Sequence, residues 1–100
     1  MSLRIKVQLL KGATNHQYVI NTHNTVTFQS YDSTICIIDH EESKITFGAD
    51  WDYSITTAKY RNEFLRQQGL PALANAVAIR KAINEGHFLH FTVIYDSGLR

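Results

Sequence analysis

The chain has 100 residues, of which 44% are hydrophobic and 19% charged, and its net charge at pH 7 is +1. These values are typical of one compact soluble domain, so we expect residues 1–100 to form a single domain. They exclude a strongly basic nucleic-acid-binding protein, and no run approaches the ~20 apolar residues of a membrane span.

The single cysteine excludes an intrachain disulfide and fits a reducing compartment. The N-terminal segment lacks the charged stretch and long apolar run of a secretory signal. We therefore expect a cytoplasmic protein.

The first 48 residues alternate like β-strands separated by short polar turns. In the first strand we expect the apolar set to face the core and the polar set to face away. The apolar set is Leu3, Ile5, Val7 and Leu9, and the polar set is Arg4, Lys6 and Gln8. Further strands are predicted at 17–21, 25–31, 33–39 and 44–48, and residues 33–48 form the clearest hairpin.

The period then changes to that of amphipathic helices. One helix is predicted from about Thr56 to Gln68, ended by Gly69, and a second begins at Pro71 and ends at Gly86. A last strand follows at 87–96. We therefore predict an α+β fold: an antiparallel β-sheet of five or six strands with two consecutive helices on one face, in the order βββββ-αα-β.

Two polar clusters are the candidate binding residues. "WDYSITT" precedes the first helix, and its hydroxyls are typical of a helix N-cap. The alternative is a recognition surface with rigid aromatic anchors. "YDS" is either a plain hairpin turn or a loop that shares this surface. The candidate binding residues are Tyr31, Asp32, Trp51, Tyr53, Ser54, Thr56 and Thr57.

The sequence contains no pattern typical of catalysis or metal binding, so we expect no enzyme, metal or cofactor. His87 and His90 are three apart in a predicted strand and would point to opposite faces. Cys36 lies among isoleucines, where burial makes a thiol unreactive. The alternative is a small hydrolase, for which only His40 beside Asp39 and Glu41 offers an acid–base group.

Charge is divided unevenly along the chain. Residues 1–58 carry four Lys or Arg and six acids, a net −2, whereas residues 59–100 carry six and three, a net +3. A second alternative is therefore a nucleic-acid-binding protein that uses the basic C-terminal half. The spacing of Lys59, Glu63 and Arg66 instead favours a solvated helix face with intrahelical ion pairs.

The segments "FQSYDSTICIID" and "ITFGADWDYSITTAKYRNEFL" resemble a group of short uncharacterised proteins encoded by bacteriophages and plasmids. The residues that carry the resemblance are Ser30, Tyr31, Trp51, Tyr53, Ser54, Thr56, Thr57, Phe64 and Leu65, within residues 28–65. The resemblance implies an origin on a mobile element and the cytoplasm of a bacterial host, and it implies no activity.

We therefore expect a small non-enzymatic binding protein that acts on a host protein, for example as an inhibitor of a host defence system. We also expect a homodimer with the sheet at its interface. Two helices cover only one face of such a sheet, and its central strands carry apolar residues on both faces.

Overall fold

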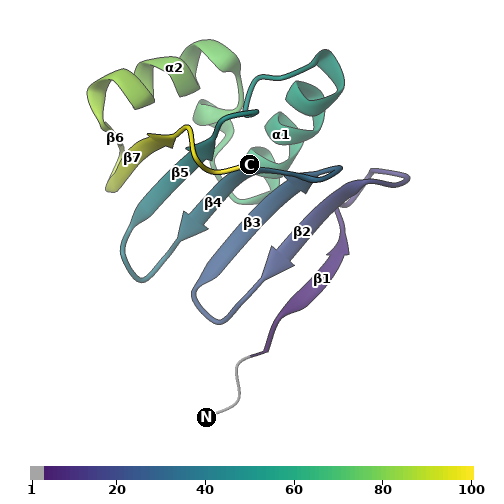
Figure 1. Ribbon diagram of the computed structural model, residues 1–100. Helices are drawn as coiled ribbons and strands as arrows, with labels where there is room; N and C mark the ends of the chain where they lie inside the picture. Colours follow the sequence, from purple (N-terminus) through teal and green to yellow (C-terminus); the bar gives the residue numbers. More distant parts are fainter. Residues whose placement is uncertain (1–3) are drawn as a thin grey trace.

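The computed structural model describes residues 4–100, and its elements follow the predicted order as far as the second helix, after which two strands stand where one was predicted (Figure 1). The helices are α1 (Ile55–Gln67) and α2 (Ala76–Glu85), joined by a short 3₁₀ turn η1 (Pro71–Leu73). The strands are β1 (Lys6–Leu9), β2 (Gln17–Asn21), β3 (Thr25–Ser30), β4 (Ser33–Asp39), β5 (Lys44–Gly48), β6 (His87–Phe88) and β7 (Phe91–Asp96).

These strands form one mixed sheet in the order β1-β2-β3-β4-β5-β7-β6. The α+β class is confirmed, but the sheet has seven strands where five or six were predicted. It is also not wholly antiparallel, because β7 pairs with β5 in parallel. The reason is the long connection: α1 and α2 carry the chain back to the end of the sheet where β5 begins. The additional strand, β6, is a two-residue edge beside β7.

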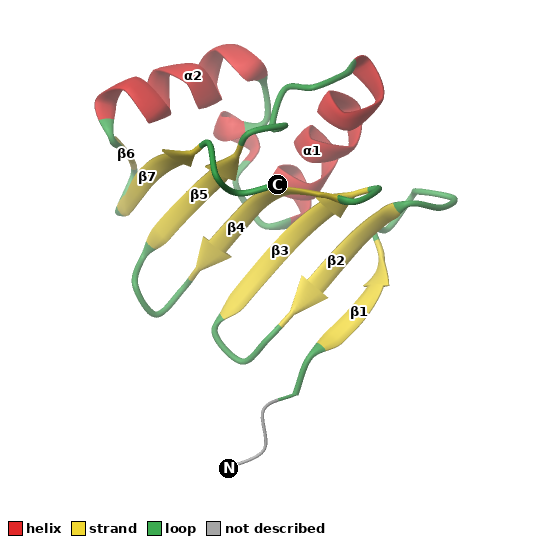
Figure 2. Ribbon diagram, viewed as in Figure 1, coloured by secondary structure: helices red, strands yellow, loops and turns green. Residues whose placement is uncertain are grey.

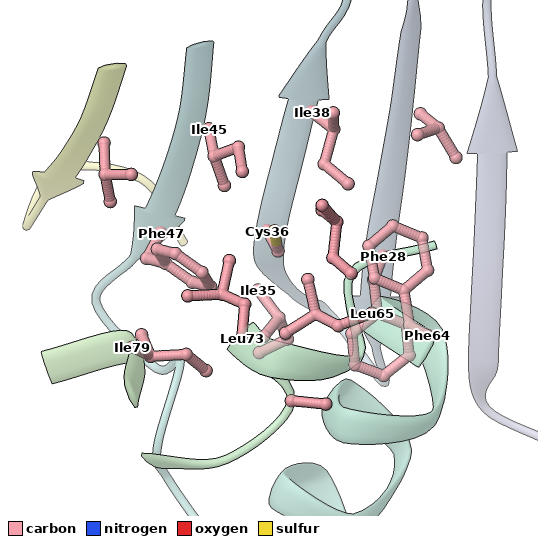
Figure 3. Close-up of a cluster of buried hydrophobic side chains, with 14 of the residues drawn as sticks. Phe28, Ile35, Cys36, Ile38, Ile45, Phe47, Phe64, Leu65, Leu73 and Ile79 are labelled. Carbon is pink, nitrogen blue, oxygen red and sulfur yellow. The ribbon is translucent and has the colours of Figure 1, made fainter. Parts of the chain in front are cut away.

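Both helices lie on the same side of the sheet, and no helix covers the opposite side (Figure 2). Between the helices and the sheet lies a core of large apolar side chains from β3, β4, β5 and both helices (Figure 3). The rings of Phe28 and Phe64 stack there with centroids 5.5 Å apart, which ties α1 to β3. We call the helix-bearing side the covered face and the other side the open face.

The helix ends follow local signals. Ser54 caps α1 by accepting a hydrogen bond from the Thr57 amide, and Asn75 caps α2 in the same way from Ala78. Gly86 ends α2 in the left-handed conformation that favours glycine. The predicted start of the second helix at Pro71 is wrong. Pro71 opens only the 3₁₀ turn, and the side-chain cap that starts the helix belongs to Asn75.

The orientation of β1 reverses the prediction. Val7 pairs with Ile20 and Leu9 with Tyr18, whereas Gln8 pairs with the buried Val19 on the covered face. The apolar residues of β1 therefore lie on the open face, where Val7 is 58% exposed, and the polar ones lie on the covered side. Alternation shows which side chains share a face, but the register with β2 decides which face that is. Leu3, predicted to belong to the apolar set, lies outside the described residues.

A β-bulge in β4 breaks the alternation. Cys36 pairs with Phe28 and Thr34 with Gln29, which leaves Ile35 as the extra residue. Ile35 and Cys36 are consequently both buried. The bulge also shifts the start of β4 by one residue, so Ser33 pairs with the buried Ser30 at the end of the sheet where α1 begins.

Candidate functional site

The two polar clusters predicted from the sequence meet in space. The turn between β3 and β4 lies beside the start of α1, and a groove of about 440 Å³ runs between them. Its lining is mostly polar: Ser30, Tyr31, Asp32, Ser33, Ile35, Asp50, Tyr53, Ser54 and Thr57. Five of the seven predicted binding residues therefore line one groove.

Hydroxyl groups form the floor of this groove. The buried Ser30 and Thr57 hydroxyl oxygens are 3.3 Å apart, and Ser54 donates a hydrogen bond of 3.2 Å to Thr57 Oγ1. On the other side, Ser33 donates to Asp50 at 2.8 Å. This last contact depends on the bulge at Ile35, because normal alternation would turn Ser33 toward the open face. The floor is thus fixed by hydrogen bonds between segments distant in sequence.

Tyr31 stands at the rim in a strained conformation. Its backbone has φ 54°, a left-handed value that a bulky residue rarely adopts. His16, with φ 58°, stacks on the Tyr31 ring at 4.6 Å and accepts a hydrogen bond from the Tyr31 amide at its carbonyl. The Tyr31 ring is nevertheless 54% exposed. Strain of this kind, held by the surrounding structure, is typical of functional positions.

The exposed charge at the groove is acidic. Asp32 and Asp50 both line it, and no lysine, arginine or histidine is among the lining residues. Tyr53, 76% exposed, also lines the groove and is its second aromatic side chain. The groove can therefore receive a group that carries positive charge and hydrogen-bond donors.

Trp51 and Thr56 do not belong to this groove. Thr56 is exposed on α1 outside it. The Trp51 ring turns toward the core, where its centroid lies 6.0 Å from that of Phe47. Two guanidinium groups lie over the same ring, Arg61 at 5.3 Å and Arg80 at 5.5 Å. Trp51 therefore joins the loop before α1 to both helices.

Arg61 is the charged residue that the sequence analysis did not single out. It is 1% exposed and donates to the Trp51 carbonyl at 2.8 Å, to Asp52 at 3.1 Å and to Asn62. Burial lowers the pKa of its guanidinium, and the hydrogen bond to Asp52 opposes that shift. Its spacing in the sequence could have predicted this burial, because Arg61 precedes Phe64 and Leu65 by three and four residues and so lies on the buried stripe of α1.

The other basic residues of the helices have acidic or aromatic neighbours. Arg66 pairs with Glu63 at 3.1 Å, Arg80 with Asp52 at 3.3 Å, and the Lys59 ammonium lies over the Tyr60 ring. Lys81 and Glu85 are 4.0 Å apart. The Arg66–Glu63 and Lys81–Glu85 pairs are intrahelical ion pairs of the kind predicted for a solvated helix face.

The alternative catalytic groups lie elsewhere. The His40 ring contacts Phe91 edge-on at 6.5 Å, and Asp39 accepts hydrogen bonds from the amides of Glu41 and Glu42. Cys36 is fully buried, and its burial raises the pKa of the thiol. Within residues 4–100, no three His, Cys, Asp or Glu side chains come together as a metal site would require.

No helix among the described residues has both the length and the apolar character needed to cross a membrane. Residues 1–83 match the model of a family of unknown function (DUF8033), and the chain belongs to this family. No curated protein and no solved structure matches the chain. The family is uncharacterised, as the resemblance implied, whereas an origin on bacteriophages or plasmids stays a prediction.

Proposed function

We propose that this member of the DUF8033 family is a non-enzymatic binding protein whose groove, between the β3–β4 turn and the start of α1, holds a basic segment of a partner protein. The observation that carries the proposal is the convergence of two segments about 20 residues apart in sequence. Their hydroxyls form a rigid floor, and two exposed tyrosines stand at the margins.

The geometry resembles that of an interaction hot spot. Tyrosine supplies a large contact area at a low entropic cost, and it is enriched at the centres of interfaces. Here His16 stacks on one of the two rings, and the backbone of Tyr31 is fixed by a hydrogen bond of 2.7 Å. A partner side chain that enters the groove therefore meets a surface that needs little reorganisation on binding.

The chemistry of the partner follows from the charge of the groove. Asp32 has an exposed carboxylate, and Asp50 keeps one carboxylate oxygen beyond the hydrogen bond from Ser33. An arginine or lysine of the partner matches these acids and the hydroxyl acceptors around them. A basic side chain flanked by polar residues is thus the preferred ligand.

The biological setting rests on the resemblance given above. We place the protein on a bacteriophage or plasmid and its partner among the proteins of the bacterial cytoplasm, where a small inhibitor of a host defence system would act. Its size and the groove are consistent with stoichiometric binding of one host protein.

Capture of proteins from a bacterial lysate at low and high salt tests the proposal. The tagged chain is compared with Tyr53→Ala/Asp32→Asn, which removes one tyrosine and one acid from the groove. Ile55→Ala is the matched control, because Ile55 is 91% exposed at the start of α1 and does not line the groove.

The expected result is a protein retained by the original chain and by Ile55→Ala, lost from the groove variant, and released as salt rises. Equal retention by all three folded chains would contradict the proposal. A captured protein that is indifferent to salt would contradict the basic ligand.

A further inference from the structure

A second hollow, of about 580 Å³, lies on the open face of the sheet beside the turn that joins β3 to β4. Its floor comes from β1, β2 and β3, through side chains that alternate along the strands with those of the covered face (Figure 1). This hollow, which we call the open-face pocket, shares Tyr31 and Asp32 with the groove. The turn therefore contributes the same two residues to two separate hollows.

Apolar and aromatic side chains form most of the open-face pocket. Val7 and Ile20, which are partners across β1 and β2, supply an apolar patch. The aromatic rings are those of Tyr18 and of the stacked pair of His16 and Tyr31. Because the Tyr31 amide donates to the His16 carbonyl at 2.7 Å, the stacked pair is fixed before any ligand enters.

The polar part of the pocket offers acceptors and negative charge. The Gln29 amino group donates to the Tyr31 carbonyl at 2.7 Å, which leaves the side-chain oxygen of Gln29 as an acceptor. Asp32 has an exposed side chain that forms no ion pair within residues 4–100. Apart from His16, no basic side chain in this part of the chain lines the pocket. The pocket therefore suits a cation with an apolar stem.

We propose that the open-face pocket binds the guanidinium of an arginine in the same partner segment that occupies the groove. The inference rests on the proposed function for the identity of the partner. An arginine matches each part of the lining, because its methylene stem fits the apolar patch and its planar head can stack on a tyrosine ring. Its N–H groups can then donate to Asp32 and Gln29.

The turn would thus lie between two basic side chains of one segment, one in the groove and one in the pocket. Because Asp32 lines both hollows, its carboxylate attracts either cation. Two linked contacts give a higher affinity than either contact alone. Arginine is favoured over lysine in the pocket, since an ammonium has no plane that can stack on a ring.

A titration of the full chain with N-acetylarginine amide, followed by NMR, tests the pocket. We expect saturable shifts of the Gln29 side-chain amide and of the Tyr18 and His16 ring signals, with a dissociation constant in the millimolar range. The citrulline analogue has nearly the same shape without the charge and should bind at least about tenfold more weakly. The lysine analogue should bind about fivefold more weakly than arginine.

Matched variants separate the pocket from the groove. Tyr18→Leu removes a ring from the pocket but keeps an apolar side chain, and it should weaken binding of the arginine compound by about fivefold or more. Tyr53→Leu makes the same change in the groove and should leave the pocket signals unaffected. If Tyr18→Leu does not fold, Asp32→Asn provides the second variant, because its side chain is exposed. It should also weaken the response of the pocket signals.

Unchanged Gln29 and Tyr18 signals at millimolar concentrations of the arginine compound would overturn the pocket. Shifts confined to the amides of Ser33, Tyr53 and Ser54 would overturn it as well, while they would leave the groove of the proposed function intact. Equal binding of the arginine and citrulline compounds would overturn the recognition of a cation.

Capture from a lysate tests whether the arginine belongs to the partner of the groove. Tyr18→Leu and Tyr53→Leu should each retain less of the captured protein than the original chain. Full retention by Tyr18→Leu would overturn the inference. Loss from Tyr18→Leu with full retention by Tyr53→Leu would support the pocket and would contradict the proposed groove instead.

Discussion

The outer surface of the helices and the open face of the sheet differ in the number and pairing of their charged side chains. The helices expose acids and bases that pair within a few residues, as Arg66 does with Glu63 and Lys81 with Glu85. The strands of the open face present threonines and branched apolar residues with only three acidic or basic side chains, Asp39, Lys44 and Asp96. The helix surface therefore has the composition of a surface that faces water, whereas the open face is poorer in charge and is partly covered by the C-terminal segment at Leu99.

The difference shows that two solvent-exposed surfaces of one chain can have very different compositions. Charged side chains keep their hydration on the helices, where exposed ion pairs contribute little to stability. On the open face, β-branched side chains contribute hydrophobic free energy only where another surface removes them from water. The covered face gives a comparison: Arg61, the one buried charged side chain among residues 4–100, donates hydrogen bonds to the Trp51 carbonyl, Asp52 and Asn62.

The largest effect should come from that buried charge. Arg61→Ala removes the partner of Asp52 and of the Trp51 carbonyl, and should lower the free energy of unfolding by about 3 kcal/mol. Arg80→Ala removes an exposed partner of the same carboxylate and should cost less than about 1 kcal/mol. Urea unfolding of both variants gives the comparison. Similar losses would show that burial does not distinguish the two arginines.

Two glycines allow a comparison of how closely the C-terminal segment packs on the open side of β5. A Cβ at Gly48 would lie 2.8 Å from the Leu99 carbonyl oxygen and also against the Thr34 carbonyl. Gly48→Ala must therefore displace the backbone of β4 at Thr34 as well as the C-terminal segment, at a cost of about 2 kcal/mol in thermal unfolding. Gly98→Ala meets only the Asp96 carboxylate at 3.3 Å, a side chain that can move, and should be nearly neutral. Equal stability of the two variants would contradict a steric requirement for glycine at position 48.

The burial of Cys36 on the covered face should make the stability of the chain depend on pH at high pH. Burial raises the pKa of the Cys36 thiol above its ordinary value, so the folded chain keeps its proton while the unfolded chain loses it. The free energy of unfolding should therefore fall above pH ~8.5, the ordinary thiol pKa, by up to ~1.4 kcal/mol per pH unit. Cys36→Ala should lose stability at pH 7 but lack this added slope. Parallel profiles for the two chains would contradict a buried neutral thiol.

The smallest effect concerns the rim of the groove. Tyr31→Asn and Tyr31→Ala both remove the ring that stacks on His16, but asparagine tolerates the left-handed backbone at this position. The asparagine variant should therefore be more stable than the alanine variant by about 1 kcal/mol in thermal unfolding. Both should lose the captured partner equally. A more stable alanine variant would argue that the backbone at Tyr31 is not strained.

The sequence by itself determined the local features of this protein. The polar turn between two apolar runs fixed the β4–β5 hairpin, and the hydroxyls before residue 55 fixed the start of α1 at Ser54. Capping and alternation depend on neighbouring residues, so they can be read along the chain. The two halves of the groove were identified for the same reason, since each lies in a segment of ordinary turn and cap residues.

Only the tertiary structure decided the relations between distant segments. The parallel pairing of β7 with β5, the face to which β1 turns Val7, and the burial of Arg61 each depend on which elements meet. Trp51 was expected at a binding surface, and in the structure its ring lies beside Phe47 and under the guanidinium groups of Arg61 and Arg80. Alternation shows which side chains share a face of a strand, but it does not show which face is buried. Only the placement of the helices decides which face is covered.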